Sequence, residues 1–301
     1  TNLAANVTTS GTQTYTGAVT TASSRTLQGS TIQFVSTVTG TTATTDDLTI
    51  TGALNLDGAI TDINDLYVSG TSDIGANITT TGTQEYNNNV TLSGAARTLT
   101  TTGDTVTFTG TVNGAQNLTV DTTNSGGSSA ATVQFASTVG DTTKVGAIII
   151  TGNLNLDGNI IKTSDSSAGA TSLAVSGTSN LGADVTTTGT QQYDSVTTLS
   201  TNVTLTTTSN GTVSFGNTTD SDATDRTLAI TTAGTGDVSF TGAVGGTGGL
   251  NGLTIDTNQF NAAALTVGGT ISITNTDTAS SEITGVIAND TDAAVFTKAG
   301  T

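Results

Sequence analysis

Internal repetition is the feature of this sequence that most constrains its fold. The segment TSDIGANITTTGTQEY at residues 71–86 returns as TSNLGADVTTTGTQQY at residues 178–193, and a shorter form is already present at residues 4–15. Three of the four tyrosines therefore close one phrase, GTQxY. Self-similarity of this length indicates repeated supersecondary units that stack on one another.

Further phrases recur in the same order along the chain. LTITGALNLDGAI at residues 48–60 returns as IIITGNLNLDGNI at residues 148–160, and TIQFVSTV at residues 31–38 returns as TVQFASTV at residues 132–139. The order predicts one continuous segment of three diverged modules, the second of them lengthened. Their predicted bounds are 1–75, 76–182 and 183–301.

The unequal module lengths favour a solenoid. A closed sandwich cannot absorb about 30 extra residues without a large loop. A solenoid can add a coil and keep every existing contact, because each repeat touches only the repeats above and below it. Tandem immunoglobulin-like β-sandwiches stay open as the alternative, since turns every 8 to 12 residues or so also describe them.

The composition predicts an all-β chain. Thr is the commonest polar residue, and its branched β-carbon favours strands over helix interiors. Short stretches alternate apolar and polar residues, as at Val106 and Phe108, which places apolar side chains inside and Thr outside. The chain has no Pro, which agrees with interior strands whose N–H groups all join ladders. Coils of about 20 to 25 residues predict a parallel β-helix of about 12 to 15 coils.

The charge balance limits the partners. Lys and Arg number 6 against 23 Asp and Glu, a net charge of −17 that repels phosphate backbones and anionic membrane surfaces. We therefore expect no nucleic-acid partner. No apolar run reaches the roughly 18 residues of a membrane-spanning helix.

Several phrases resemble a known group of proteins. GTQTYTGAV at residues 11–19, RTLQGSTIQF at residues 25–34 and GTGDVSFTGAVGGTGGLNGLTID at residues 234–256 resemble repeats of filamentous-haemagglutinin-like proteins and autotransporter passengers. VFTKAGT at residues 295–301 resembles the opening of the passenger-associated transport repeat. The resemblance implies a right-handed parallel β-helix, extracellular on a Gram-negative surface, that serves adhesion, aggregation or matrix formation.

Candidate sites are few. The chain has no His and no Cys, so His- or Cys-based catalysis is excluded, and we expect no enzyme, catalytic residue or bound cofactor. The densest acidic cluster, Asp220, Asp222 and Asp225, is a weak calcium candidate that lacks the Gly and distal Glu of a helix-loop-helix site. Asp46 and Asp47 form a lesser cluster, which we interpret as solvated turn residues.

Three recurrent positions have structural interpretations. In the LNLDG phrase, the leucines are predicted to fill the interior and Asp-Gly to form a turn. In the RTL phrase, the arginine is predicted to pair on the surface with a carboxylate of an adjacent coil. In GTQxY, the tyrosine is predicted to be a half-buried ring stacker rather than a glycan-binding ladder. The residues concerned are Leu54, Leu56, Leu154 and Leu156; Arg25, Arg97 and Arg226; and Tyr15, Tyr86 and Tyr193.

The expected function is a structural or adhesive rod or fibre. Its expected partners are a host or matrix glycan or protein surface and more of the same solenoid, continued covalently or docked end to end. Two alternatives stay open: an ice-binding solenoid that uses Thr-x-Thr units such as residues 49–51 and 105–107, and a polysaccharide-processing β-helix that uses paired carboxylates. The Thr-x-Thr units do not recur at one coil position, which predicts a ragged rank.

Overall fold

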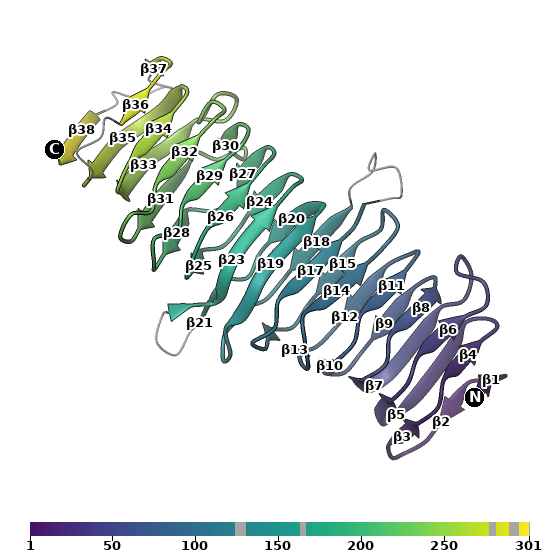
Figure 1. Cartoon of the computed structure of the whole chain (residues 1–301). Coiled ribbons are helices and arrows are strands. Elements are labelled where there is room, and N and C mark those ends of the chain that lie inside the picture. Colours follow the sequence, from purple (N-terminus) through teal and green to yellow (C-terminus); the bar gives the residue numbers. More distant parts are fainter. Residues whose placement is uncertain (124–130, 163–166, 277–280, 289–294, 301) are drawn as a thin grey trace. The chain divides into compact units, whose positions relative to one another are not determined.

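The computed structural model describes residues 1–123, 131–162, 167–276, 281–288 and 295–300. Over these residues the chain is all-β without a helix, and parallel strands stack in about 12 turns as a β-solenoid (Figure 1). The chain forms two compact units, Thr1–Asn153 and Leu154–Thr301. Their boundary lies inside the predicted module 76–182; the division into three modules stays a prediction.

Unit 1 consists of three parallel ladders that the chain visits in turn. The first contains β1 (Asn2–Leu3), β4 (Val19–Thr21), β6 (Val38–Gly40), β8 (Ile60–Ile63), β11 (Ile78–Thr80), β14 (Arg97–Thr100), β17 (Leu118–Asp121) and β19 (Val145–Thr151). The second contains β2 (Val7–Thr8), the first halves of β5 (Arg25–Phe34) and β7 (Leu48–Leu56), β9 (Leu66–Val68), β12 (Gln84–Tyr86), β15 (Val106–Phe108) and β18 (Thr132–Phe135). The third contains β3 (Gln13–Tyr15), the second halves of β5 and β7, β10 (Ser72–Ile74), β13 (Val90–Leu92) and β16 (Val112–Asn113).

Unit 2 has the same three-ladder plan. Its first ladder contains β23 (Ala170–Val175), β26 (Gln191–Tyr193), β29 (Val213–Phe215), β32 (Val238–Phe240), β34 (Phe260–Ala262) and β36 (Glu282–Ile283). The second contains β20 (Asn153–Leu156), β24 (Ser179–Leu181), β27 (Thr197–Leu199), β30 (Thr219–Ser221), the start of β35 (Leu265–Asn275) and β37 (Ile287–Ala288). The third contains β25 (Val185–Thr187), β28 (Val203–Thr207), β31 (Arg226–Thr232), β33 (Leu250–Thr257), the rest of β35 and β38 (Val295–Gly300).

The direction of pairing decides between the two predicted folds. Among the described strands only β21 (Ile161–Lys162) and β22 (Ser167–Ala168) pair antiparallel. Immunoglobulin-like sandwiches are built from antiparallel sheets, so the sandwich alternative is wrong. The β-solenoid prediction is confirmed, whereas its right-handed coiling stays a prediction.

The interior of each ladder is a stack of like side chains in register. On the first ladder of unit 1, Val38 pairs with Ile60, which pairs with Ile78, and all three are fully buried. Each buried aliphatic side chain contributes about 1.5–3 kcal/mol to folding. The predicted interior position of the LNLDG leucines is confirmed, since all four are at most 2% exposed. The chain also changes direction after these leucines, with a bend at Gly58 and at Gly158, and the N–H groups of Asp57 and Gly58 donate to the Phe34 carbonyl of the preceding coil.

The prediction that Thr faces outward is only partly right. The side chains of Thr80, Thr187 and Thr207 are buried, and each of these residues is the last one of its strand. Each donates its hydroxyl to the carbonyl of a nearby corner glycine: Gly82 at 2.8 Å, Gly189 at 2.6 Å and Gly211 at 2.7 Å. Their inward position agrees with the alternation, because each lies two residues after a buried aliphatic residue: Ile78, Val185 and Leu205. The expectation that Thr as a residue type faces outward is what fails here.

Corners need glycine where coils approach closely. β7 bends between two ladders at Gly52, whose φ is +137°, and a Cβ there would lie 2.0 Å from the Gly29 carbonyl oxygen of the preceding coil. Only Gly adopts this backbone without strain, and only Gly leaves room for the neighbour. The glycine of the recurring ITG tripeptide is therefore needed for successive coils to stack.

A second corner device uses Asn. The side-chain oxygen of Asn6 accepts the backbone N–H of Thr26 at 2.9 Å, and Asn77 accepts that of Thr98 at 3.0 Å. Asn202 repeats the contact in unit 2 with Thr227 at 3.0 Å. These asparagines immediately precede a strand and satisfy a donor of the next coil, which the turn leaves without a ladder partner.

The sequence modules run out of step with the three-strand coil. Tyr15 lies on the third ladder of unit 1, but the equivalent Tyr86 lies on the second. From β3 to β12 the chain advances by eleven strand segments, because β5 and β7 each serve two ladders, and eleven is not a multiple of three. One phrase therefore fits different faces, because each inner position offers the same stacking environment.

Replacing Leu56 tests the inward assignment. Leu56→Asp places a carboxylate between Phe34 and Ile74, and we expect it to lower the free energy of unfolding by at least about 3 kcal/mol. Thr49→Ser, at an outward position of the same strand, is the matched control and should change it by less than about 0.5 kcal/mol. Urea unfolding followed by circular dichroism measures both. Equal midpoints would show that the inward assignment is wrong.

Candidate functional site

The GTQxY phrase forms a buried hydrogen-bond network. The Gln84 amide nitrogen donates to the Thr80 hydroxyl at 3.2 Å and to the Thr100 carbonyl of the next coil at 2.9 Å. The Tyr86 hydroxyl donates to the Gln84 side-chain oxygen at 3.0 Å. The phrase therefore spaces Thr, Gln and Tyr so that each satisfies another inside the coil.

The network recurs at the other two copies. Gln191 donates to the Thr187 hydroxyl at 3.2 Å and to the Thr206 carbonyl at 2.9 Å, and the Tyr193 hydroxyl donates to Gln191 at 3.2 Å. The copy at Tyr15 is similar but half-buried, and its hydroxyl donates to Gln13 at 2.8 Å.

The tyrosine rings stack on phenylalanines of the following coil. Ring centroids lie 5.3 Å apart for Tyr15 and Phe34, 5.3 Å for Tyr86 and Phe108, and 5.1 Å for Tyr193 and Phe215. The predicted stacking role is confirmed. Tyr86 and Tyr193, however, are fully rather than half buried, and their burial raises the pKa of both hydroxyls. Neither ring is open to a glycan.

The arginines of the RTL phrase do not share one role. Arg226 makes the predicted kind of ion pair, at 2.9 Å, but its partner Asp222 belongs to the preceding corner of the same chain segment. Arg25 instead donates to the backbone carbonyls of Leu3 and Ala4. Arg97 is 8% exposed and donates to the Ala95 carbonyl at 2.9 Å. The prediction of a carboxylate on an adjacent coil is wrong for these three residues.

The acidic cluster at residues 220–225 is divided among separate contacts. Asp222 binds Arg226 and accepts the N–H of Thr224, and these hydrogen bonds hold its pKa below the usual range. Asp220 lies on β30, is 8% exposed and accepts the N–H of Thr247 at 3.0 Å, while Asp225 is exposed. Over the described residues, no group of three or more acidic side chains gathers to hold a metal ion.

Asp46 organises a corner rather than facing solvent. Its carboxylate is 1% exposed and accepts the backbone N–H groups of Thr41 at 2.8 Å and Thr42 at 2.9 Å, so the predicted solvated role is wrong for it. Desolvation opposes ionisation, but the hydrogen bonds from Thr42 and Thr41 outweigh it and lower the pKa of Asp46. Asp47, half-buried, accepts a bond from Asn64 at 2.9 Å.

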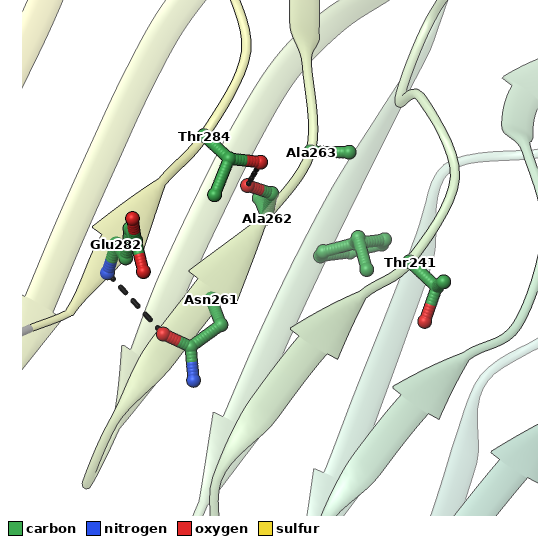
Figure 2. Close-up of a pocket in the computed structure, with 7 residues that line it drawn as sticks. Thr241, Asn261, Ala262, Ala263, Glu282 and Thr284 are labelled. Carbon is green, nitrogen blue, oxygen red and sulfur yellow. Dashed lines mark hydrogen bonds between the residues drawn. The ribbon is translucent and has the colours of Figure 1, made fainter.

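A pocket of about 220 Å³ opens on the first ladder of unit 2 (Figure 2). β34 and β36 border it, and the Glu282 backbone N–H donates to the Asn261 side-chain oxygen at 3.2 Å. Glu282 is the one titratable group in its lining. A single carboxylate provides no acid–base pair for hydrolysis of a glycosidic bond. The lining residues are Phe240, Thr241, Asn261, Ala262, Ala263, Glu282 and Thr284.

Three features of the structure were not predicted from the sequence. Tyr67 is 37% exposed on the second ladder of unit 1, where it is in register with Thr49 and Glu85. The second is the set of corner asparagines. Its sequence signal is a recurring Asn that is followed by a β-branched residue or Leu and then by Thr. The third is the near-complete burial of Arg97, and no signal in the local sequence distinguishes it from Arg25.

The comparisons add no relative. No family model, no curated protein and no solved structure matches this chain. Over the part of the chain that the structure describes, no helix has the length and apolar character needed to cross a membrane.

Removing Gln84 tests the buried network. Gln84→Leu leaves the Tyr86 hydroxyl without an acceptor in a fully buried place, and we expect a loss of about 1–3 kcal/mol of unfolding free energy. Gln13→Leu is the matched control; its half-buried tyrosine can turn to water, so the loss should be smaller. Adding Tyr86→Phe to Gln84→Leu should recover part of the stability in urea unfolding. A double variant that is no more stable than Gln84→Leu would contradict the network.

The stability contributed by Asp46 should depend on pH. Its folded pKa lies below the unfolded value of about 3.9, so its contribution is complete above that value and is lost as the pH falls through the folded pKa. Wild type should therefore exceed Asp46→Asn in unfolding free energy at neutral pH, and the gap should close in acid. Urea titrations between about pH 2 and pH 7 measure it. A gap that stays constant over this range would contradict the assignment.

Proposed function

We propose that this chain is a structural and adhesive segment of an extracellular repeat protein at a bacterial surface. One observation carries the proposal: over the described residues no three acidic side chains gather, and the pocket beside β34 and β36 is lined by a single titratable side chain, Glu282. Each unit offers regular ladder faces for contact, and the described residues provide no paired acid and base for turnover. We accordingly propose that it is not an enzyme.

The solenoid fold supports this role physically. Each coil is held by main-chain ladders and a continuous inner stack, so insertions at corners leave the ladders intact. The register offset is 18 residues between Leu48 and Leu66 but 30 between Leu118 and Ile148, and both pairs stay in ladder. A surface protein can therefore vary its corner loops without losing its support.

The resemblance of phrases to filamentous-haemagglutinin-like proteins and autotransporter passengers supports the remaining details. We propose a right-handed coil and a location on the surface of a Gram-negative bacterium. We propose as partners a host or matrix glycan or protein surface, and further copies of the solenoid joined end to end. The net charge of −17 argues against nucleic acid.

Ice binding is the second candidate, and one face of unit 2 favours it. On its third ladder the outward positions Thr204, Ala229, Thr254 and Ser272 are in register, as are Thr206, Thr231, Asp256 and Thr274. On the second ladder of unit 1, by contrast, Tyr67 and Glu85 separate Thr49 from Thr107, as the predicted raggedness requires. Thermal hysteresis of the purified chain tests this candidate.

An adhesion assay tests the leading proposal. Beads coated with the chain should adhere saturably to at least one immobilised glycan or matrix protein in a broad panel. Beads coated with Leu56→Asp at equal density are the control, since they carry nearly the same composition without the stacked fold. Adhesion that is equal for both beads, or release of reducing sugar from a polysaccharide, would contradict the proposal.

A further inference from the structure

The pocket on the first ladder of unit 2 follows from the register of three successive strands, β32, β34 and β36. Phe240 and Ala262 are register partners, and both are buried. The ladder continues one residue further, because the Ala263 N–H donates to the Phe240 carbonyl at 3.1 Å. The Thr284 N–H likewise donates to the Ala262 carbonyl at 3.0 Å. Since side chains alternate along a strand, Ala263 lies in an outward column between Thr241 and Thr284.

The small side chain of Ala263 hollows the surface at this point (Figure 2). The adjacent outward column carries longer side chains, Asn261 and Glu282, which are register partners and border the hollow on a second side. The lining also includes Ala262, 5% exposed, and Phe240, 3% exposed. The result is a pocket of about 220 Å³ with an apolar floor and a polar rim.

The rim offers both hydrogen-bond donors and acceptors to a ligand. The Asn261 side-chain oxygen accepts the Glu282 backbone N–H at 3.2 Å, and this bond fixes the orientation of the amide. The amide nitrogen carries two further N–H donors, which bond no residue that the structure describes. The Glu282 carboxylate is an exposed acceptor, and the exposed hydroxyls of Thr241 and Thr284 can donate or accept.

This combination favours one class of ligand. Glu282 and the net charge of −17 oppose an anion. An ammonium group is a donor only and cannot accept from the Asn261 amide. The hydroxyls of a neutral sugar both donate and accept, and the C–H face of its ring can pack on an apolar floor. The volume lies below the roughly 300–1,000 Å³ of pockets for drug-sized ligands, so it suits a single ring.

We propose that this pocket binds one neutral hexose ring, as the terminal residue of a surface or matrix glycan. Glu282 accepts hydrogen bonds from ring hydroxyls, Asn261 donates to another ring oxygen, and Ala263 packs against the C–H face. The preference for a neutral hexose follows from the lining of the pocket. Its place at the end of a glycan rests on the proposed adhesive function. The single carboxylate binds the sugar without cleaving it.

The shape of the pocket sets the expected strength. The pocket is open to solvent and contacts only one ring, so a free hexose should half-saturate it at a concentration on the order of 1–10 mM. Many copies of the chain on one bead present many pockets to an immobilised glycan. Adhesion of beads can therefore be strong although each pocket binds weakly.

Saturation-transfer nuclear magnetic resonance of the intact chain with galactose, glucose and mannose tests the pocket. At least one of these neutral hexoses should receive saturation from the protein in a saturable way, and galacturonate and glucosamine should bind at least tenfold more weakly. Ala263→Leu fills the hollow with an outward side chain and should abolish the transfer, and Glu282→Gln should weaken binding at least tenfold. Glu85→Gln is the matched control, since Glu85 is an outward ladder residue of unit 1 outside the pocket, and it should bind like wild type.

Several outcomes would overturn the pocket. These are the absence of transfer to all three hexoses, tighter binding of galacturonate or glucosamine, and undiminished transfer in an Ala263→Leu chain. Circular dichroism and the urea midpoint must show that each variant is folded like wild type. If Ala263→Leu does not fold, Glu282→Gln decides, and unchanged hexose binding in that variant would overturn the proposal.

Bead adhesion separates this inference from the proposed function. Adhesion to a hexose-terminated glycan that Ala263→Leu removes would support both. Hexose binding in solution with bead adhesion unchanged in Ala263→Leu would keep the pocket and overturn its assignment to glycan adhesion. Hexose binding without adhesion to any member of the panel would overturn the proposed function and leave the pocket. Adhesion without hexose binding would have the reverse meaning.

Discussion

Register between successive coils is the constraint on which the rest of this structure depends. A parallel ladder with residue-by-residue pairing stacks each inner side chain on its counterpart in the next coil, as Tyr86, Phe108 and Phe135 do at centroid distances of 5.3 and 5.1 Å. A shift by one residue would turn this whole set outward. The register therefore determines which positions are core, which are corner and which are free for contact with a partner.

Polar residues in the interior and at the corners satisfy the hydrogen-bonding groups that the ladders leave unpaired. The Thr80, Gln84 and Tyr86 network occupies an inner corner, and Asn77 bonds the N–H of Thr98 in the following coil. A chain this rich in Thr and Asn can fold because these side chains close backbone donors and acceptors that turns leave open.

Much of the fold could be predicted from the sequence, and less of the sites. Alternation predicted buried positions such as Leu56 because it is a local property of a strand, and the recurring phrases predicted stacking. The inward position of Arg97 and Thr187 agrees with the alternation, since Arg97 lies two residues before Leu99 and Thr187 two residues after Val185. Their hydrogen-bond partners could not be predicted, because contacts across a ladder join residues about 20 positions apart. Copies of the GTQxY phrase lie on different ladders and do not stack on one another. The sequence repeat therefore does not show which residues are neighbours in adjacent coils.

Disulfide cross-linking across one ladder step tests the register most directly, since the chain has no cysteine of its own. Gln33 and Asn55 are outward partners on adjacent coils, whereas Thr91 lies on the same column three coils from Gln33. Ladder neighbours are about 4.8 Å apart, within the Cα range of a disulfide, and three steps are roughly 14 Å. The variant Gln33→Cys/Asn55→Cys should therefore oxidise to an intramolecular disulfide, and Gln33→Cys/Thr91→Cys should not. A failure of the first pair to cross-link, or efficient cross-linking of the second in the folded chain, would contradict the parallel in-register solenoid.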